Sequence, residues 1–192
     1  MKIIEGPDGF CDEIEKVFRG IEKDCLVCNY PDCVGLIWLI EEEVERLYNL
    51  GVPLIQVNNG PTFLHSFSEG TDGKIELAVR YPSCKQLSLN NGIRRCLIYQ
   101  NRPFNCRIYP LGLETTGEGV AVWALHLDCL FIANKINEEQ LEQIKQDLVL
   151  IIDHLHPSLV EEILSTYLEV EEVICFPDGE NRYVKVREVK KK

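Results

Sequence analysis

The residues of this chain best suited to chemistry are its cysteines, which number nine among 192 residues. Cys25, Cys28 and Cys33 form a C-x2-C-x4-C cluster, and four more follow at wider spacing: Cys84, Cys96, Cys106 and Cys129. Two thiolates three residues apart in a turn can converge on one ion, which is why this spacing recurs in zinc and iron–sulfur sites. The cysteine pattern therefore predicts a metal centre that holds an iron–sulfur cluster or zinc.

The later cysteines lie in a part of the chain that is rich in turn-forming residues. Cys84 follows a Pro-Ser pair, and Cys106 stands three residues after a proline. Cysteines that only fill a core usually lie on apolar strands or helices, so this placement favours ligands. Cys11 and Cys175 have no such neighbours, and we expect them to be buried filler.

Two cationic side chains, Arg102 and Arg107, flank Cys106. A four-thiolate site with Zn²⁺ or a [4Fe–4S]²⁺ core carries a net charge of about −2, which nearby arginines would offset. We predict that Arg102 and Arg107 are cofactor-binding residues, and three roles stay open for them. They could donate hydrogen bonds to cysteine sulfur, clamp an anionic substrate, or pair with surface carboxylates.

A redox-active dithiol is the other chemistry that a CxxC pair supports. No strand of a βαβ pattern precedes Cys25, which weakens a thioredoxin-like interpretation. The chain also lacks a serine nucleophile elbow, a P-loop and an HExxH motif. The sequence therefore names no catalytic residue and leaves enzymatic activity open.

The segment CLIYQNRPFNCRIYP over 96–110 resembles a pattern of the YkgJ-like cysteine-cluster family, C-x-[IV]-Y-x-x-R-P-x-x-C-R-x-[FY]-P. That family is described as a zinc- or iron-chelating domain and often as an iron–sulfur-cluster-containing protein. The resemblance covers about residues 25–130, and it implies seven cysteine ligands: Cys25, Cys28, Cys33, Cys84, Cys96, Cys106 and Cys129. The chain departs from the family after Cys33, where valine stands in place of a second cysteine.

Flagellin lysine N-methylases contain this domain, so the resemblance makes methyl transfer conceivable. The chain shows no glycine-rich cofactor loop after a strand, and we do not predict methylation. An alternative function is a structural zinc-binding interaction module without catalysis. A third is an acidic interaction protein in which the cysteines are incidental.

Seven thiolates are one fewer than two closed four-coordinate sites require. One site would then keep an open position, where a metal binds a ligand or does redox or transfer chemistry, or a non-cysteine ligand would complete it. His126, three residues before Cys129, is the first candidate for that ligand, and Asp128 is the second. The alternative for His126 is a half-buried histidine on a strand.

The composition limits the classes of function. A 45% hydrophobic and 27% charged chain is typical of a folded protein. The net charge of −11 argues against nonspecific binding to nucleic acid or anionic membranes. The longest apolar run, 34–40, is far shorter than a bilayer span, and residues 1–18 lack the apolar segment of a signal peptide. We therefore expect a cytoplasmic protein with reduced thiols, and a protein partner is left open.

The elements that must position the cysteines belong to an α+β fold. We expect helices packed on small antiparallel β pieces around a loop-rich cysteine–metal centre. The chain is expected to be a single domain over 1–192, with a metal-binding region over 25–130 and a C-terminal helical part over 137–173. The metal would tie together loops that have few apolar contacts, so part of its binding energy would be folding energy.

Periodicity gives the approximate bounds of these elements. Helical spacing predicts helices over 12–19, over 34–50 with a solvated glutamate face, and over 137–173 with Asn137 as N-cap and a break at Pro157. Residues 52–83, with a turn at 69–73, are typical of β structure. Strands are predicted over 120–127 and, at a sheet edge, over 183–189. Residues 84–112 are predicted to be mostly loop.

Overall fold

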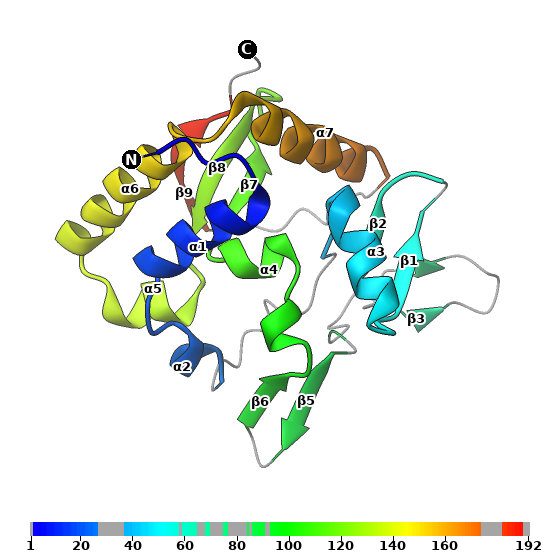
Figure 1. Ribbon diagram of the computed structural model, residues 1–192. Coiled ribbons are helices and arrows are strands. Elements are labelled where there is room, and N and C mark those ends of the chain that lie inside the picture. The colour runs from blue at the N-terminus through cyan, green and yellow to red at the C-terminus, as the bar shows by residue number, and fades with distance from the viewer. Residues whose placement is uncertain are drawn as a thin grey trace.

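The protein has an α+β fold in which small antiparallel sheets pack against helices (Figure 1). The computed structural model describes residues 2–26, 37–57, 59–64, 68–69, 75–76, 84, 86–90, 93–173 and 182–189. Cys28, Cys33 and Cys175 lie outside these residues. In the part of the chain that is described, no helix combines the length and the apolar character needed to cross a bilayer.

A three-stranded antiparallel sheet forms the centre of the fold. Its strands are β7 (Leu111–Thr115), β8 (Ala121–His126) and β9 (Tyr183–Glu188), in the order β7-β8-β9. The strands predicted over 120–127 and 183–189 are confirmed, and β9 lies at an edge as expected. All four residues of β8 between its two ends are buried, so the strand is covered on both faces.

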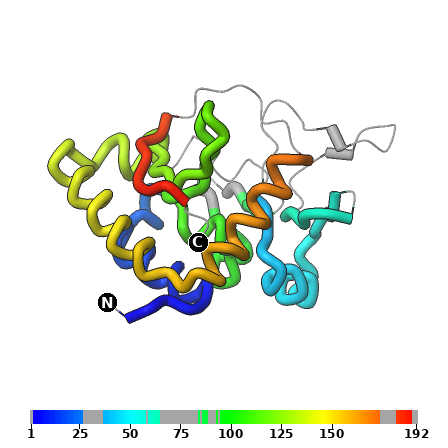
Figure 2. The backbone as a smooth tube through the Cα atoms, turned by 90° about the horizontal axis from the view of Figure 1, so that it is seen from above, coloured from blue at the N-terminus to red at the C-terminus, as the bar shows by residue number. Residues whose placement is uncertain are grey.

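Two long helices, α6 (Glu138–Ile152) and α7 (Pro157–Val173), pack against this sheet and meet in a V (Figure 2). The predicted cap of α6 is confirmed. The Asn137 side-chain oxygen accepts a hydrogen bond from the Gln140 N–H at 2.9 Å, and Gln140 Oε1 accepts one from the Asn137 N–H at 3.0 Å. The predicted break at Pro157 is also confirmed, because α7 begins at that residue.

The main core lies between the sheet, α6, α7 and the N-terminal helix α1 (Pro7–Val17). Phe10 of α1 packs edge-on against Trp123 of β8, with ring centroids 5.4 Å apart. Cys11 is only 1% exposed in this core, so the burial predicted for it is confirmed. Helix α1 starts five residues before the predicted start at Asp12, because Pro7 suits the first turn of a helix.

A smaller second core lies beneath helix α3 (Glu41–Asn49), beside the hairpin of β1 (Leu54–Gln56) and β2 (Thr62–Leu64). Its buried residues are Ile37, Leu39, Leu47, Val52, Leu64 and Cys84. The predicted helix over 34–50 is wrong at its start, because the chain is extended over 37–40. There Trp38 bridges to Phe63 of β2, and Leu39 N–H donates to the Thr62 carbonyl at 3.0 Å.

The segment over 84–112, predicted as loop, carries regular elements. Strands β5 (Leu87–Asn90) and β6 (Ile93–Cys96) form a hairpin, followed by the 3-10 turn η1 (Tyr99–Asn101) and helix α4 (Phe104–Ile108). Two further short helices, α2 (Glu22–Cys25) and α5 (Leu130–Lys135), were not predicted. Strands β3 (Ser68–Glu69) and β4 (Ile75–Glu76) pair antiparallel, in the segment predicted as β structure. The turn expected at 69–73 lies, after Glu69, outside the described residues.

Candidate metal centre

The base of the β5–β6 hairpin brings Cys84 and Cys96 together. Cys96 pairs with Leu87 across the hairpin, and the Leu87 N–H donates to the Cys84 carbonyl at 2.8 Å. Cys84 is 6% exposed and forms part of the second core. Its pKa is raised by burial, and the neighbouring Cys96 contributes to that rise. The two thiols therefore interact, although 11 residues separate them in the chain.

Both of these sulfur atoms accept a backbone hydrogen bond from the residue two positions later in the chain. The Gln86 N–H bonds to Cys84 and the Ile98 N–H bonds to Cys96. Burial raises the pKa of each thiol, whereas each hydrogen bond lowers it, because an N–H donor stabilises the thiolate. Backbone N–H groups directed at sulfur also tune metal–thiolate centres, so this local geometry suits ligands.

Cys106 of α4 lies next to both the second core and a neighbouring cavity. The residue packs partly buried against the core that contains Cys84. It also lines a cavity of about 380 Å³ together with Cys25, at the end of α2, and with Tyr99 and Arg102. Two predicted ligands that lie 81 residues apart in the sequence, 106 against 25, therefore face the same cavity.

Cys129 lies apart from the hairpin base, buried in the main core at the N-cap of α5. Helix α5 packs on α2, the helix that ends at Cys25, and Lys135 pairs with Asp24 at 2.8 Å across this contact. Cys129 therefore begins the helix that packs on α2, the helix that ends at Cys25. A role for it as a ligand stays a prediction.

The described residues alone do not complete a ligand set. Among them, no three cysteine, histidine, aspartate or glutamate side chains are grouped closely enough to hold a metal ion. Two of the predicted ligands, Cys28 and Cys33, lie outside the residues that the structure describes. The N–H donors at Cys84 and Cys96 fit a thiolate centre in their chemistry.

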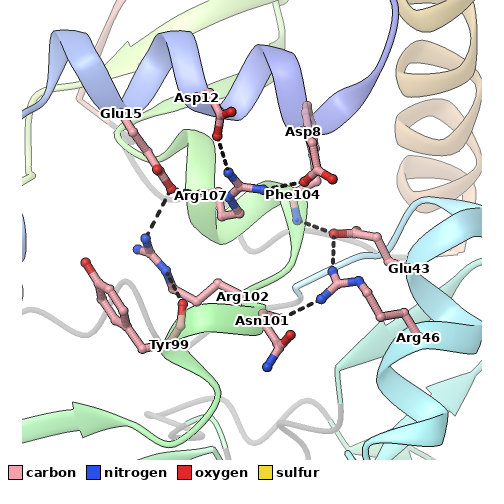
Figure 3. A network of polar contacts seen from close by, with 10 residues as sticks. All are labelled: Asp8, Asp12, Glu15, Glu43, Arg46, Tyr99, Asn101, Arg102, Phe104 and Arg107. Atoms are coloured by element: carbon pink, nitrogen blue, oxygen red, sulfur yellow. Dashed lines mark hydrogen bonds and ion pairs between the residues drawn. The ribbon is translucent and has the colours of Figure 1, made fainter.

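The arginines that flank Cys106 pair with carboxylates of helix α1 (Figure 3). Arg107 contacts three of them: Asp8 at 2.5 Å, Asp12 at 2.9 Å and Glu15 at 3.2 Å. These acids recur along one face of α1, so they reach the same guanidinium. Of the three roles considered for Arg107, carboxylate pairing is the one seen. The identity of these partners was not predicted, because they lie 92 to 99 residues away in the chain.

Arg102 lies closer to the cysteines. Its Nε donates to the Tyr99 carbonyl at 3.1 Å, and its guanidinium stands 4.0 Å from the centre of the Tyr99 ring. A second nitrogen lies 3.4 Å from Glu15. The positive charge lowers the pKa of Cys96, against the larger effect of burial, so Arg102 acts electrostatically on a predicted ligand. This is the effect expected of an arginine beside a thiolate centre.

Glu43 corrects the expectation of a fully solvated glutamate face on α3. Glu41 and Glu42 are exposed, but Glu43 is only 5% exposed. One of its carboxylate oxygens accepts a hydrogen bond from the Phe104 N–H of α4 at 2.5 Å, and the other accepts one from the Ile40 N–H at 3.3 Å. Burial raises the pKa of Glu43 to about 7 despite these donors. Nothing in a run of glutamates distinguishes this one in the sequence.

His126 lies at the end of β8 and is half-buried. Its Nε2 is 3.4 Å from a carboxylate oxygen of Glu114, and its ring stacks on Tyr109 with centroids 6.0 Å apart. Burial lowers the pKa of His126, and the nearby Asp128 carboxylate has a smaller, opposite effect. Asp128, the second candidate ligand, accepts a hydrogen bond from the Arg182 N–H at 3.4 Å. These contacts match the alternative of a half-buried strand histidine.

Glu114, the neighbour of His126, makes stability depend on pH. Burial, with a smaller effect of the Glu171 carboxylate, raises the pKa of Glu114 from 4.5 to about 7. Between pH 4.5 and about pH 7, Glu114 therefore keeps its proton in the folded state but has lost it in the unfolded state. The stabilisation present below pH 4.5 is lost as the pH rises to about 7. A shift of this size corresponds to about 3 kcal/mol.

Glu114→Gln should remove most of that loss. We expect the free energy of unfolding of the native chain to fall by about 2 kcal/mol more than that of the variant between about pH 5 and pH 8. Urea unfolding at both pH values measures the difference, and other titrating groups cancel in the comparison. Glu118→Gln, at an exposed residue of the same hairpin, is the matched control. Equal pH dependence in all three proteins would contradict the prediction.

No protein-family model, curated protein or solved structure matches this chain. The resemblance to the YkgJ-like family therefore stays a prediction from the cysteine motifs. The gathered cysteines and their hydrogen bonds are the features from which a function can be proposed.

Proposed function

We propose that this protein binds an iron–sulfur cluster or zinc through thiolates of the 25–130 region. The observation that carries the proposal is the proximity, two at a time, of cysteines from separate segments. Cys84 and Cys96 interact at the hairpin base, Cys106 packs on the core that contains Cys84, and Cys106 shares a cavity with Cys25. Core-filling cysteines have no reason to gather in this way, whereas ligands must.

The chemistry of the donors supports the same proposal. Burial raises the pKa of both Cys84 and Cys96, and the backbone N–H groups at the two residues, with the Arg102 charge near Cys96, act in the opposite direction, toward the thiolate forms that bind metals. A bound iron–sulfur cluster would supply redox chemistry, and bound zinc would supply a structural link between segments or a Lewis acid. A reducing compartment such as the cytoplasm, in which thiols stay available as ligands, is part of the proposal.

The alternative, a structural zinc module without catalysis, is favoured by one feature. The β5–β6 hairpin pairs with no third strand among the described residues. Isolated two-stranded hairpins are marginally stable in water. A metal at the hairpin base would hold such an element in place without any further chemistry.

Metal analysis of anaerobically purified protein tests the proposal and separates its two forms. Broad absorbance near roughly 400 nm with bound iron would support the iron–sulfur centre. A colourless protein with stoichiometric zinc would support the structural module. Folded protein that stays metal-free after reconstitution with iron and sulfide or with zinc, and whose nine cysteines all react with a thiol reagent on unfolding, would contradict both.

A further inference from the structure

Helix α3 holds the segment that leads to Cys106 at two points. Glu43 accepts the hydrogen bond from the Phe104 N–H, at the first residue of α4, across 61 positions of sequence. One turn later in α3, Arg46 donates to the Asn101 carbonyl at 3.1 Å and also contacts the Glu43 carboxylate at 3.3 Å. Both ties end within five residues of Cys106 (Figure 3).

The Glu43 carboxylate does at α4 what a capping side chain normally does. The N-cap of α4 is Pro103, which has no side-chain acceptor for the free N–H groups of the first turn. Glu43 supplies that acceptor from another element. Cys106 lies two residues after Phe104 and hydrogen-bonds through its own N–H to the Pro103 carbonyl at 3.0 Å, so the position of this turn sets the position of the thiol.

Joining two elements through a buried carboxylate is energetically unfavourable, because the charged group loses its hydration. Burial raises the pKa of Glu43 to about 7, which shows how unfavourable its environment is for charge. An apolar residue of similar size would pack beside Leu47 and Ile40 without that cost. What the carboxylate adds is direction, because a hydrogen bond fixes the position of the Phe104 amide in a way that apolar contact does not.

We propose that Glu43 is a positioning residue whose carboxylate sets the orientation of α4 and thereby delivers the Cys106 thiol to the metal centre. This inference depends on the proposed function for its metal, but not for its geometry. Glu43 contacts no ligand itself in the described structure; it acts through the Phe104 amide.

The first test uses Co²⁺ as the probe, because thiolate-to-cobalt charge-transfer absorbance rises with the number of cysteine ligands. We expect Glu43→Met, which removes the acceptor of the Phe104 N–H, to bind Co²⁺ but to lose about a quarter of the charge-transfer intensity per bound ion, one thiolate of four. Cys106→Ser should show the same loss. The matched control is Glu42→Met, at an exposed position of the same helix, which should keep the native spectrum. A native spectrum in Glu43→Met would overturn the proposal.

The second test needs no metal and distinguishes failure of this inference from failure of the proposed function. In metal-free protein, alkylation by iodoacetamide, followed by mass spectrometry, reports the exposure of each thiol. We expect Cys106 to react about tenfold faster in Glu43→Met, with Cys96 unchanged. Equal acceleration at both sites, or none, would overturn the positioning role. If no Co²⁺ binds to the native chain, the proposed function fails while this measurement still decides the role of Glu43.

If the Glu43 variant does not fold, a second substitution in α3 can test the same inference. Arg46→Met removes the tie to the Asn101 carbonyl and keeps the carboxylate. The alkylation rate of Cys106 should rise in this variant too, but by a smaller factor. Unchanged Cys106 reactivity in a folded Arg46→Met protein, together with an unfolded Glu43→Met protein, would count against the inference.

Discussion

Cys96→Ser and Cys106→Ser are expected to weaken metal binding by about 100-fold or more, because a serine hydroxyl replaces a thiolate ligand. Since the unfolded chain offers no preformed site, part of the lost binding energy is lost from folding. The free energy of unfolding of the metal-loaded protein should therefore fall by about 3 kcal/mol. Metal content after dialysis against a chelator and urea unfolding measure the two effects.

The control for these variants is Cys11→Ala, which changes a thiol buried in the main core. It should keep its metal and lose only packing, about 1 kcal/mol. Cys175→Ser, at the other cysteine predicted as filler, should also keep its metal. Equal metal loss in all four variants would defeat the assignment of ligands, and full metal retention in Cys106→Ser would exclude that residue as a ligand.

Removal of the metal is expected to loosen the second core and leave the main core folded. The second core has six buried members beneath a nine-residue helix. The main core, by contrast, joins a three-stranded sheet to α1, α6 and α7. Small cores contribute little stability, so the elements around the hairpin base should depend most on the metal.

Amide hydrogen exchange before and after chelation measures this effect. Exchange of the β5–β6 hairpin and of residues 37–40 should become faster by about 100-fold in the metal-free protein. Amides of β8, α6 and α7 should change by no more than about twofold. Uniformly faster exchange would mean that the metal supports the whole fold, and no change would mean that the hairpin base is stable alone.

The helices and strands predicted well are those with long, regular patterns. The helices α6 and α7 carry apolar residues at helical spacing over many turns, and Asn137 and Pro157 mark their starts. In these two helices the local sequence contains enough periods to exclude a strand. Strand β8 is instead a short apolar run whose four inner residues are all buried, bounded by the turn residues of 115–119.

Failures occur where a short segment depends on partners elsewhere in the chain. Residues 37–40 are four buried apolar residues in a row, which fit a helix start as well as a strand. Their pairing with β2 decides the outcome. Helix α4 spans five residues, too few to show a period. For the site, spacing and motif placed the cysteines in one region, but the carboxylates around Arg107 and the Phe104 amide at Glu43 come from distant sequence.

The attachment of α4 to the N-terminal helix has a consequence for the conditions in which the protein works. The three carboxylates that hold Arg107 stand at the surface, where dissolved ions shield charges from one another. Shielding acts over about 8 Å at physiological ionic strength and about 3 Å at 1 M salt. Concentrated salt therefore weakens the grip on the Cys106-bearing helix while strengthening apolar burial elsewhere. The position of the Cys106 thiol should therefore be less tightly fixed at high salt concentration than at low salt concentration.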